Sequence, residues 1–377
     1  MFSNLLTSQM KNIIYLLIAF LLCSCKESRN NESTGILDIP IGITQLVSLP
    51  LSTIAEDIQA IELELNDESV MNPDRIKRIF FTDSILIIAE QYKLFVFNIN
   101  GKFICAIGNR GPGPGDFLRS IRNFTMDEKN RCLFVVSHQK IFHFNIDGKL
   151  IKTFEIDSDK SPIRDINFIN NELWLVVENE RRDINGPYNH SVLYKMNTDF
   201  QITDSFPFRD TYYLNETFIN SHQYEDFILR RDTIISLYCS EVTRGLTKVQ
   251  LLRDTLYSFK NNCLIPELKL NFKNNGIDGN GKIFINLLNL YRSSRYVFAN
   301  YDNFQDGKRY KFCFDTKTGK GYNVSDGYND DINQTVNPVS IRPHILNTEL
   351  FYYWHTNIRL DGLEEPNPTL YIGRLRK

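Results

Sequence analysis

The chain has 377 residues, of which 42% are hydrophobic and 23% are charged, with a formal net charge of −2. The apolar fraction is that of a globular protein, and the small net charge gives no electrostatic reason to expect a nucleic-acid partner. The 27 Phe and 18 Tyr residues favour β structure, because aromatic side chains fit the half-buried surface of a sheet.

The first 24 residues have the pattern of an export signal. Lys11 precedes an apolar run, Ile13–Leu22, which is too short to cross a bilayer stably. A leucine, a small residue and a cysteine then follow at Leu22, Ser24 and Cys25. This ending resembles the lipobox of bacterial lipoproteins, which implies that residues 1–24 are a signal peptide and that Cys25 becomes the lipidated first residue of the mature chain. The alternative is a cleaved secretory peptide whose cysteines are incidental.

Residues 25–56 are expected to carry the lipidated cysteine, a tether and a lead-in to the folded domain. Lys26–Gly35 is polar and rich in breakers, which is the composition of an unstructured tether. Ile36–Glu56 is mixed in character. Ile58–Leu65 then alternates like a strand, but no neighbouring segment offers it a hairpin partner.

An internal repeat follows. Lys93–Ile104 reads KLFVFNINGKFI and Lys140–Ile151 reads KIFHFNIDGKLI, so eight of twelve positions are identical at an offset of 47 residues. Each copy alternates apolar and polar residues, turns at Asn-Gly or Asp-Gly, and continues in strand-forming residues. The pattern predicts a β-hairpin, because these dipeptides adopt the positive φ that a tight hairpin turn requires.

The repeat extends to a unit of four short strands. In the first unit, the runs RIKRIFF, ILIIAE, KLFVFNI and KFICAIG are joined by tight turns, which predicts an antiparallel meander. The residues that end the third strand of successive units lie 47, 52, 63 and 55 residues apart: Phe97, Phe144, Met196, Phe259 and Phe314. Such periods are typical of β-propeller blades. The unit boundaries are poorly marked over residues 241–280.

The two ends of the chain complement each other. A sixth unit, with strands at Ser340–Arg342, Leu350–His355 and Thr369–Leu375, ends one strand short, whereas Ile58–Leu65 has no partner. Pairing Ile58–Leu65 with the last strand would close a ring and remove exposed strand edges. The sequence therefore predicts an all-β, six-bladed β-propeller over residues 57–377, closed by an N-terminal strand that completes the last blade.

The segment between the first two units carries a family resemblance. It resembles the six-bladed β-propeller lipoproteins of Bacteroidetes, relatives of NHL-repeat propellers, which carry a dGkfl-x-x-iG-x-x-G-x-GPGEF pattern. The matching positions are Gly101, Lys102, Phe103, Ile104, Ile107, Gly108, Gly111, Gly113, Pro114, Gly115, Asp116 and Phe117, with Asp116 replacing the usual Glu. The resemblance implies an exported protein that is lipid-anchored in the bacterial cell envelope, with the outer membrane as the expected location. It implies no ligand.

The glycine-rich segment Gly108–Phe117 has two interpretations. Backbone N–H groups of such loops can bind phosphate, but this one has no Walker Lys-Ser/Thr and two prolines that lack N–H groups. We therefore interpret Gly111, Gly113, Pro114, Gly115, Asp116 and Phe117 as a structural inter-blade turn. The Asp-rich segments Asp326–Asp331 and Asn274–Asn280 lack EF-hand spacing, so they also favour turns over calcium loops.

No catalytic or metal-binding pattern stands out. The five cysteines after Cys25 are odd in number and none forms a C-x-x-C, so a structural zinc site is not expected. No G-x-S-x-G motif occurs. We accordingly expect no metal and no cofactor.

Function is expected on the loops of one face. In a propeller, the links between blades and the loops between second and third strands emerge on the same side, and long loops on a rigid scaffold are where binding concentrates. The candidate ligand-binding residues on these loops are Arg181, Arg182, Tyr188, Arg359 and Asp361. We expect a non-enzymatic binding or scaffold module for a glycan, a peptide or an envelope protein. The alternatives are solvated loops without a ligand, and a propeller hydrolase or lyase that acts on polysaccharide with acids from several blades.

Overall fold

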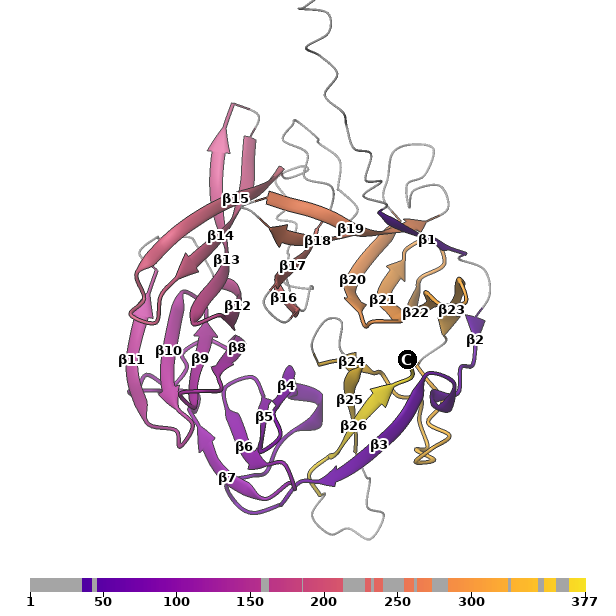
Figure 1. The fold of residues 1–377 in the computed structure, drawn as a ribbon. Helices are drawn as coiled ribbons and strands as arrows, with labels where there is room; N and C mark the ends of the chain where they lie inside the picture. Colours follow the sequence, from indigo (N-terminus) through magenta and orange to yellow (C-terminus); the bar gives the residue numbers. More distant parts are fainter. Residues whose placement is uncertain are drawn as a thin grey trace, which may run out of the picture. The chain divides into compact units, whose positions relative to one another are not determined.

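The computed structural model describes residues 36–42, 46–156, 163–184, 186–212, 228–231, 234–239, 254–260, 263–272, 284–324, 327–344, 349–356 and 366–377. Within these ranges every regular element is a β-strand, apart from two three-residue 3₁₀ turns, η1 (Leu51–Thr53) and η2 (Pro73–Arg75). The strands form six sheets that follow one another around a common axis (Figure 1). The predicted all-β, six-bladed propeller is therefore confirmed.

Blades 1 to 3 are antiparallel meanders of consecutive strands, with the first strand of each nearest the axis (Figure 1). Blade 1 contains β4 (Arg78–Phe81), β5 (Ile85–Ala89), β6 (Leu94–Asn98) and β7 (Phe103–Ile107). Blade 2 contains β8 (Ile121–Asp127), β9 (Cys132–Ser137), β10 (Lys140–Asn145) and β11 (Leu150–Glu155). Blade 3 contains β12 (Ile163–Ile169), β13 (Glu172–Asp183), β14 (Gly186–Met196) and β15 (Ile202–Tyr212).

Blades 4 and 5 each have a fifth strand, which pairs in parallel with the outermost strand. Blade 4 contains β16 (Ile228–Arg231), β17 (Ile234–Cys239), β18 (Thr255–Lys260) and β19 (Cys263–Phe272), and β1 (Leu37–Ile41) is added to β19. Blade 5 contains β20 (Ile285–Arg292), β21 (Tyr296–Asn303), β22 (Lys308–Asp315) and β23 (Lys320–Val324), and β2 (Leu46–Val47) is added to β23.

Blade 6 is assembled from both ends of the chain. Its first three strands are β24 (Arg342–Pro343), β25 (Leu350–His355) and β26 (Thr369–Leu375), and its fourth is β3 (Ala55–Glu62). β3 pairs antiparallel with β26, with Ile61 opposite Leu370. The predicted closure is therefore confirmed.

The closing strand lies three residues earlier in the sequence than predicted. Side-chain hydrogen bonds end it: the Asn66 side chain accepts a bond from the Ser69 backbone N–H (3.0 Å), and Ser69 Oγ donates to the Glu64 carbonyl (2.7 Å). These bonds turn the chain after Glu62, because a short polar side chain competes with the strand for backbone groups. Leu63, expected within the strand, instead packs into the core between blades 6 and 1.

The repeated hairpin has the predicted turn. Gly101 and Gly148 stand at φ +83° and +85°, in the left-handed region that glycine adopts without strain. In each copy the asparagine three residues before the glycine accepts a backbone hydrogen bond across the turn, from Lys102 to Asn98 (3.0 Å) and from Lys149 to Asn145 (2.7 Å). These contacts fix the register between the third and fourth strands.

The hydrophobic core lies between blades rather than in one central mass. One cluster joins blades 1 and 2 and contains Val96, Phe117, Phe124 and Phe144. Further clusters join blades 2 and 3, blades 3 and 4, and blades 6 and 1, and the largest spans blades 4, 5 and 6. Because each blade is buried on both faces, the inner strands consist almost wholly of buried residues.

The lead-in has structure that the sequence analysis does not anticipate. Besides β1 and β2, its backbone is bonded to blade 5 and to the C-terminus, because Leu51 N donates to the Asn329 carbonyl (2.7 Å) and Arg376 N donates to the Ile54 carbonyl (2.8 Å). Asp331 accepts hydrogen bonds from the backbone and hydroxyl of Ser52. The Asp-rich segment therefore anchors the lead-in.

Candidate functional site

The links between blades and the turns between second and third strands lie on one side of the propeller, which we call the link face. Hydrogen bonds join the two kinds of segment. The first residue of β8, Ile121, donates its N–H to the carbonyl of Gln91 in the β5–β6 turn (2.7 Å), and Ile163 of β12 donates to His138 in the β9–β10 turn (3.0 Å). Each blade therefore helps to position the next one at this face.

The link between blades 1 and 2 has a rigid form that its sequence explains. Asp116 Oδ1 accepts the N–H of Asn109 (3.0 Å), and the N–H of Phe117 donates to the Asn109 carbonyl (2.8 Å). Phe117 is fully buried against Phe142 and Phe144, with ring centroids 5.0 and 6.2 Å away. Glycine is required at position 108, where φ is +74° and a Cβ would lie 2.8 Å from Cδ2 of Phe117.

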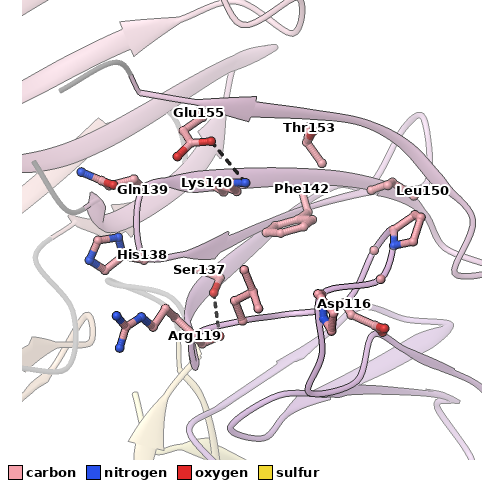
Figure 2. Close-up of a pocket in the computed structure, with 15 residues that line it drawn as sticks. Asp116, Arg119, Ser137, His138, Gln139, Lys140, Phe142, Leu150, Thr153 and Glu155 are labelled. Carbon is pink, nitrogen blue, oxygen red and sulfur yellow. Dashed lines mark hydrogen bonds and ion pairs between the residues drawn. The ribbon is translucent and has the colours of Figure 1, made fainter. Parts of the chain in front are cut away.

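A groove of about 600 Å³ opens between this link and the outer half of blade 2 (Figure 2). One wall is the link, with Pro112, Pro114 and the exposed side chain of Leu118, and the other is formed by β10 and β11. The volume lies within the range of small-ligand sites. It is the candidate binding site best placed to use the predicted loop face.

Apolar side chains line one part of the groove and polar side chains line the rest. Phe142 and Leu150 line its floor, and Lys140 and Glu155 form an ion pair at one end (3.2 Å) (Figure 2). His138 and Gln139, from the β9–β10 turn, lie beside Lys140 (Figure 2). Asp116 and Arg119 supply charges from the link. This mixture suits a ligand with both apolar and hydrogen-bonding groups.

The predicted ligand-binding residues are only partly described. Arg181 and Tyr188 face each other across the β13–β14 hairpin, and Arg182 pairs with Pro187. The predicted loop that carries these three residues is mostly strand, because β13 and β14 continue their pairing to Asp183 and Gly186. Both arginines are exposed. Arg359, Asp361 and Cys25 lie outside the described residues.

The sequence analysis misses a set of cations that recurs where the inner strands begin at the link face. Lys77, Arg122, Arg164 and Arg342 each follow an isoleucine at this position in blades 1, 2, 3 and 6. In β8 and β12 the arginine is the extra residue of a β-bulge, a device that redirects a side chain. The repeated Ile-Lys or Ile-Arg dipeptide is the signal that could have identified them.

Hydrogen bonds connect these cations from blade to blade. Arg342 Nη1 donates to the Lys77 carbonyl (3.1 Å), and Lys77 Nζ donates to the Ile121 carbonyl (2.9 Å). Burial lowers the pKa of Lys77, and the charge of Arg122 lowers it further. Burial also lowers the pKa of Arg122, and the charge of Arg164 adds to this effect. Burial is thus the main cause of both lowered pKa values, and the neighbouring cation adds to it in each case.

Buried carboxylates offset part of this charge. Glu178 Oε2 accepts the Nε of Arg164 at 2.9 Å, with both side chains almost fully buried, and Asp165 accepts hydrogen bonds from Asn123 and from the Ile166 backbone (2.8 Å). A buried charge is tolerated only where it is paired and hydrogen-bonded. These two carboxylates therefore hold the inner strands of blades 2 and 3 in place.

The described part of the chain offers no arrangement typical of a metal site, a membrane-spanning helix or a disulfide. No group of three or more His, Cys, Asp or Glu side chains in these residues is arranged to hold a metal ion. None of the helices in the same ranges has the length and hydropathy to span a membrane. Cys105, Cys132, Cys263 and Cys313 are free thiols, and burial raises the pKa of Cys105 to about 11 and that of Cys313 to about 12.

Comparison with solved structures gives matches that cover most of the chain. A candidate exported protein from Bacteroides fragilis is 16% identical, with 91% of this chain and 100% of that chain covered and a TM-score of 0.59. The WD40 domain of Neurospora crassa Pan2 is 11% identical, with 80% and 76% covered and a TM-score of 0.40. A protein of unknown function from Bacteroides caccae is 10% identical, with 77% and 90% covered and a TM-score of 0.38.

The B. fragilis structure shares the fold of this chain, and at this identity nothing more follows from it. No curated protein matches the sequence. A family model described as a domain of unknown function, DUF4934, matches residues 34–371, which extend from before β1 into β26 of blade 6. The chain therefore belongs to the DUF4934 family.

Proposed function

We propose that this protein is a lipid-anchored propeller of the bacterial cell envelope, akin to NHL-like propeller lipoproteins, that binds a glycan, a peptide or a partner protein through its link face. The groove beside the first link carries the proposal, because it combines a ligand-sized volume with a rigid frame. The lipobox pattern at Leu22–Cys25 supports export and acylation, and the B. fragilis protein of the same fold is itself a candidate exported protein.

The lining of the groove favours a polypeptide segment over the other partners. Leu118 is 67% exposed at its rim, an apolar side chain that a partner could bury. The outermost strand, β11, pairs only with β10 among the described strands, and its residues Leu150, Thr153 and Glu155 line the groove. An extended peptide could therefore combine main-chain and side-chain contacts at this edge.

The alternative enzyme, a hydrolase or lyase, needs two carboxyl groups that are able to exchange protons with a substrate. Two buried carboxylates of blade 3, Asp165 and Glu178, accept hydrogen bonds from Asn123, Arg164 and Ser191. Their contacts fit a structural role, so no specific observation favours the enzyme.

The groove is tested by substituting its exposed leucine. Leu118→Asp should reduce recovery of the partner from cross-linked envelopes by at least about tenfold, because a charge that replaces an apolar side chain covered by the partner must be desolvated. Ile202→Asp is the matched control, since Ile202 is also an exposed apolar residue (48%) but is the first residue of β15 and does not line the groove. Equal recovery by both variants would place the binding site elsewhere. Parallel arrays of envelope glycans and of peptides would distinguish the two ligand classes.

The anchor is tested separately. Cys25→Ala removes the thiol at the predicted processing point, so the protein should lose acylation and its association with membranes should fall. Fractionation after a high-salt wash, with mass spectrometry of the N-terminal peptide, measures both. A variant that still partitions fully with membranes would contradict the lipoprotein interpretation.

A further inference from the structure

A second pocket lies at the junction of blades 5 and 6, apart from the groove. It has a volume of about 490 Å³. Its polar lining consists of Asn289 (β20), Asn300 and Asp302 (β21), Arg309 and Lys311 (β22), Arg342 (β24), and Ser340, which precedes β24. The three cations exceed the single carboxylate by two charges.

The pocket replaces part of the core that other blades contain. Asn289, Asn300 and Lys311 lie opposite one another across three strands of blade 5. In blades 1, 2 and 3, the strand pairing shows that the two positions equivalent to Asn300 and Lys311 are both apolar. They are Ala89 and Leu94 in blade 1, Val136 and Ile141 in blade 2, and Val176 and Leu193 in blade 3. All six of these residues are at most 1% exposed.

This substitution has an energetic cost in an otherwise apolar junction. The half-buried ammonium group of Lys311 and the amide of Asn300 lose hydration, and they lack the apolar packing that the sibling blades have at these two positions. Such a departure from a repeat is expected where a site is required. Blade 5 therefore gives up core packing at the end of the junction that faces the link side.

The cations of the pocket are held by defined contacts. Arg309 donates hydrogen bonds to both oxygens of Asp302 (2.7 and 3.3 Å), so this carboxylate is already paired with a cation. Arg342 is positioned by its bond to the Lys77 carbonyl (3.1 Å) and by the ring of Trp354, whose centroid lies 5.2 Å from the guanidinium carbon. Asn289 Oδ1 accepts a hydrogen bond from the backbone N–H of Asn300 (2.9 Å). This bond fixes the orientation of the Asn289 side-chain amide, whose NH₂ group is a donor.

We infer that this pocket binds a monosaccharide-sized anion, whose carboxylate or phosphate group lies against Arg342 and Lys311. A planar guanidinium and an ammonium are the side chains that recognise such groups. Amides both donate and accept, so Asn289 and Asn300 suit the hydroxyl groups of a sugar. The site is separate from the proposed polypeptide groove and does not depend on it.

The test is calorimetric titration of the full chain with glucuronate, inorganic phosphate and glucose. We expect saturable binding of at least one anion and none of glucose; glucuronate binding alone would identify a carboxylated sugar, and phosphate binding a phosphorylated ligand. Lys311→Leu places an apolar residue at this position, as in the sibling blades, so it should weaken anion binding by at least about tenfold with an unchanged or higher melting temperature. Lys311→Gln removes only the charge and should weaken binding similarly.

Lys308→Leu is the matched control, because Lys308 lies on the same strand but does not line the pocket. It should bind the anions as the parent does. Failure of the parent to bind either anion, equal binding of glucose, or undiminished binding by both Lys311 variants would each overturn the inference.

Discussion

Blade 2 and blade 6 have the same four-stranded plan, but the chain builds them in different ways. The strands of blade 2 follow one another between Ile121 and Glu155, so every pairing is local. Blade 6 takes three strands from Arg342–Leu375 and its outermost strand from Ala55–Glu62. Local hairpins form at a small entropic cost, whereas a pairing across the whole chain forms only when the ring is complete. The stability of the closed ring should therefore depend more on the strand pairing in blade 6 than on the pairing in blade 2.

The largest effect is expected from removing the closing strand. Deletion of Asp57–Asn66 removes most of β3 and exposes the edge of β26. We expect a loss of several kcal/mol and aggregation through the open edge. Thermal melting and analytical ultracentrifugation measure the two effects.

The tether gives the control for this deletion. Deletion of Lys26–Gly35 stops short of β1, so it should change neither the melting temperature nor the monomeric state. A Δ57–66 protein that stays monomeric and melts like the parent would show that β3 is an appendage.

A smaller effect is expected from crowding inside blade 6. A Cβ at Gly373 would lie 2.7 Å from Cε1 of Phe351 and 3.0 Å from the Asp57 carbonyl, so Gly373→Ala must push β25 or β3 away. We expect a cost of about 1–3 kcal/mol. Gly42→Ala, with nothing within 4 Å of its Cβ, should be nearly neutral. Equal urea midpoints for the two variants would contradict the close packing of blade 6.

The contact that ties the C-terminus to blade 5 should depend on pH. Arg295 donates to both oxygens of Asp315 (2.9 and 2.7 Å) and to the Lys377 carbonyl (3.0 Å). The hydrogen bonds from Arg295 lower the pKa of Asp315 from 3.8 to about 2. Because the folded-state pKa is lowered, this contribution is complete above about pH 4 and is lost as the pH falls towards 2.

Asp315→Asn should therefore cost about 2 kcal/mol at neutral pH. It should cost much less in acid near pH 2. Urea unfolding of the variant and the parent at both pH values measures this difference. A cost that does not change with pH would show that the charge of Asp315 does not stabilise the fold.

The smallest effect is expected at the tip of the β13–β14 hairpin. Replacing Arg181, Arg182 and Tyr188 with alanine should change the stability by about 0.5 kcal/mol or less, because the tip lies outside the inter-blade cores. Partner binding should weaken if the hairpin contributes to the link face. A large fall in melting temperature would instead assign these residues to the scaffold.

The repeat in the sequence predicts the fold because its signals are local. Asn-Gly and Asp-Gly turns, alternation, and the spacing from Phe97 to Phe314 all mark hairpins, and each of these third-strand residues lies on the third strand of its blade. The closing pair could be predicted because both strands lacked partners. β1 and β2 could not be predicted, because each pairs in parallel with a distant strand and has no turn of its own.

The candidate sites were less accessible from the sequence. The groove depends on how the link folds over β10 and β11, which its glycines allow but do not specify. The polar pocket became visible only when strand pairing aligned Asn300 and Lys311 with the buried residues of other blades. The recurring cations, in contrast, were present as a readable dipeptide repeat.

The most direct test of the ring is a cross-link between the two ends of the chain. Gln59 and Ile372 lie directly opposite each other on β3 and β26, so Gln59→Cys with Ile372→Cys should form a disulfide within one molecule. Non-reducing mass analysis should show an oxidised monomer, and melting with and without reductant should show a gain of several kcal/mol from closing so long a loop. Cross-links only between molecules, or no cross-link at all, would contradict closure of the propeller by its N-terminal strand.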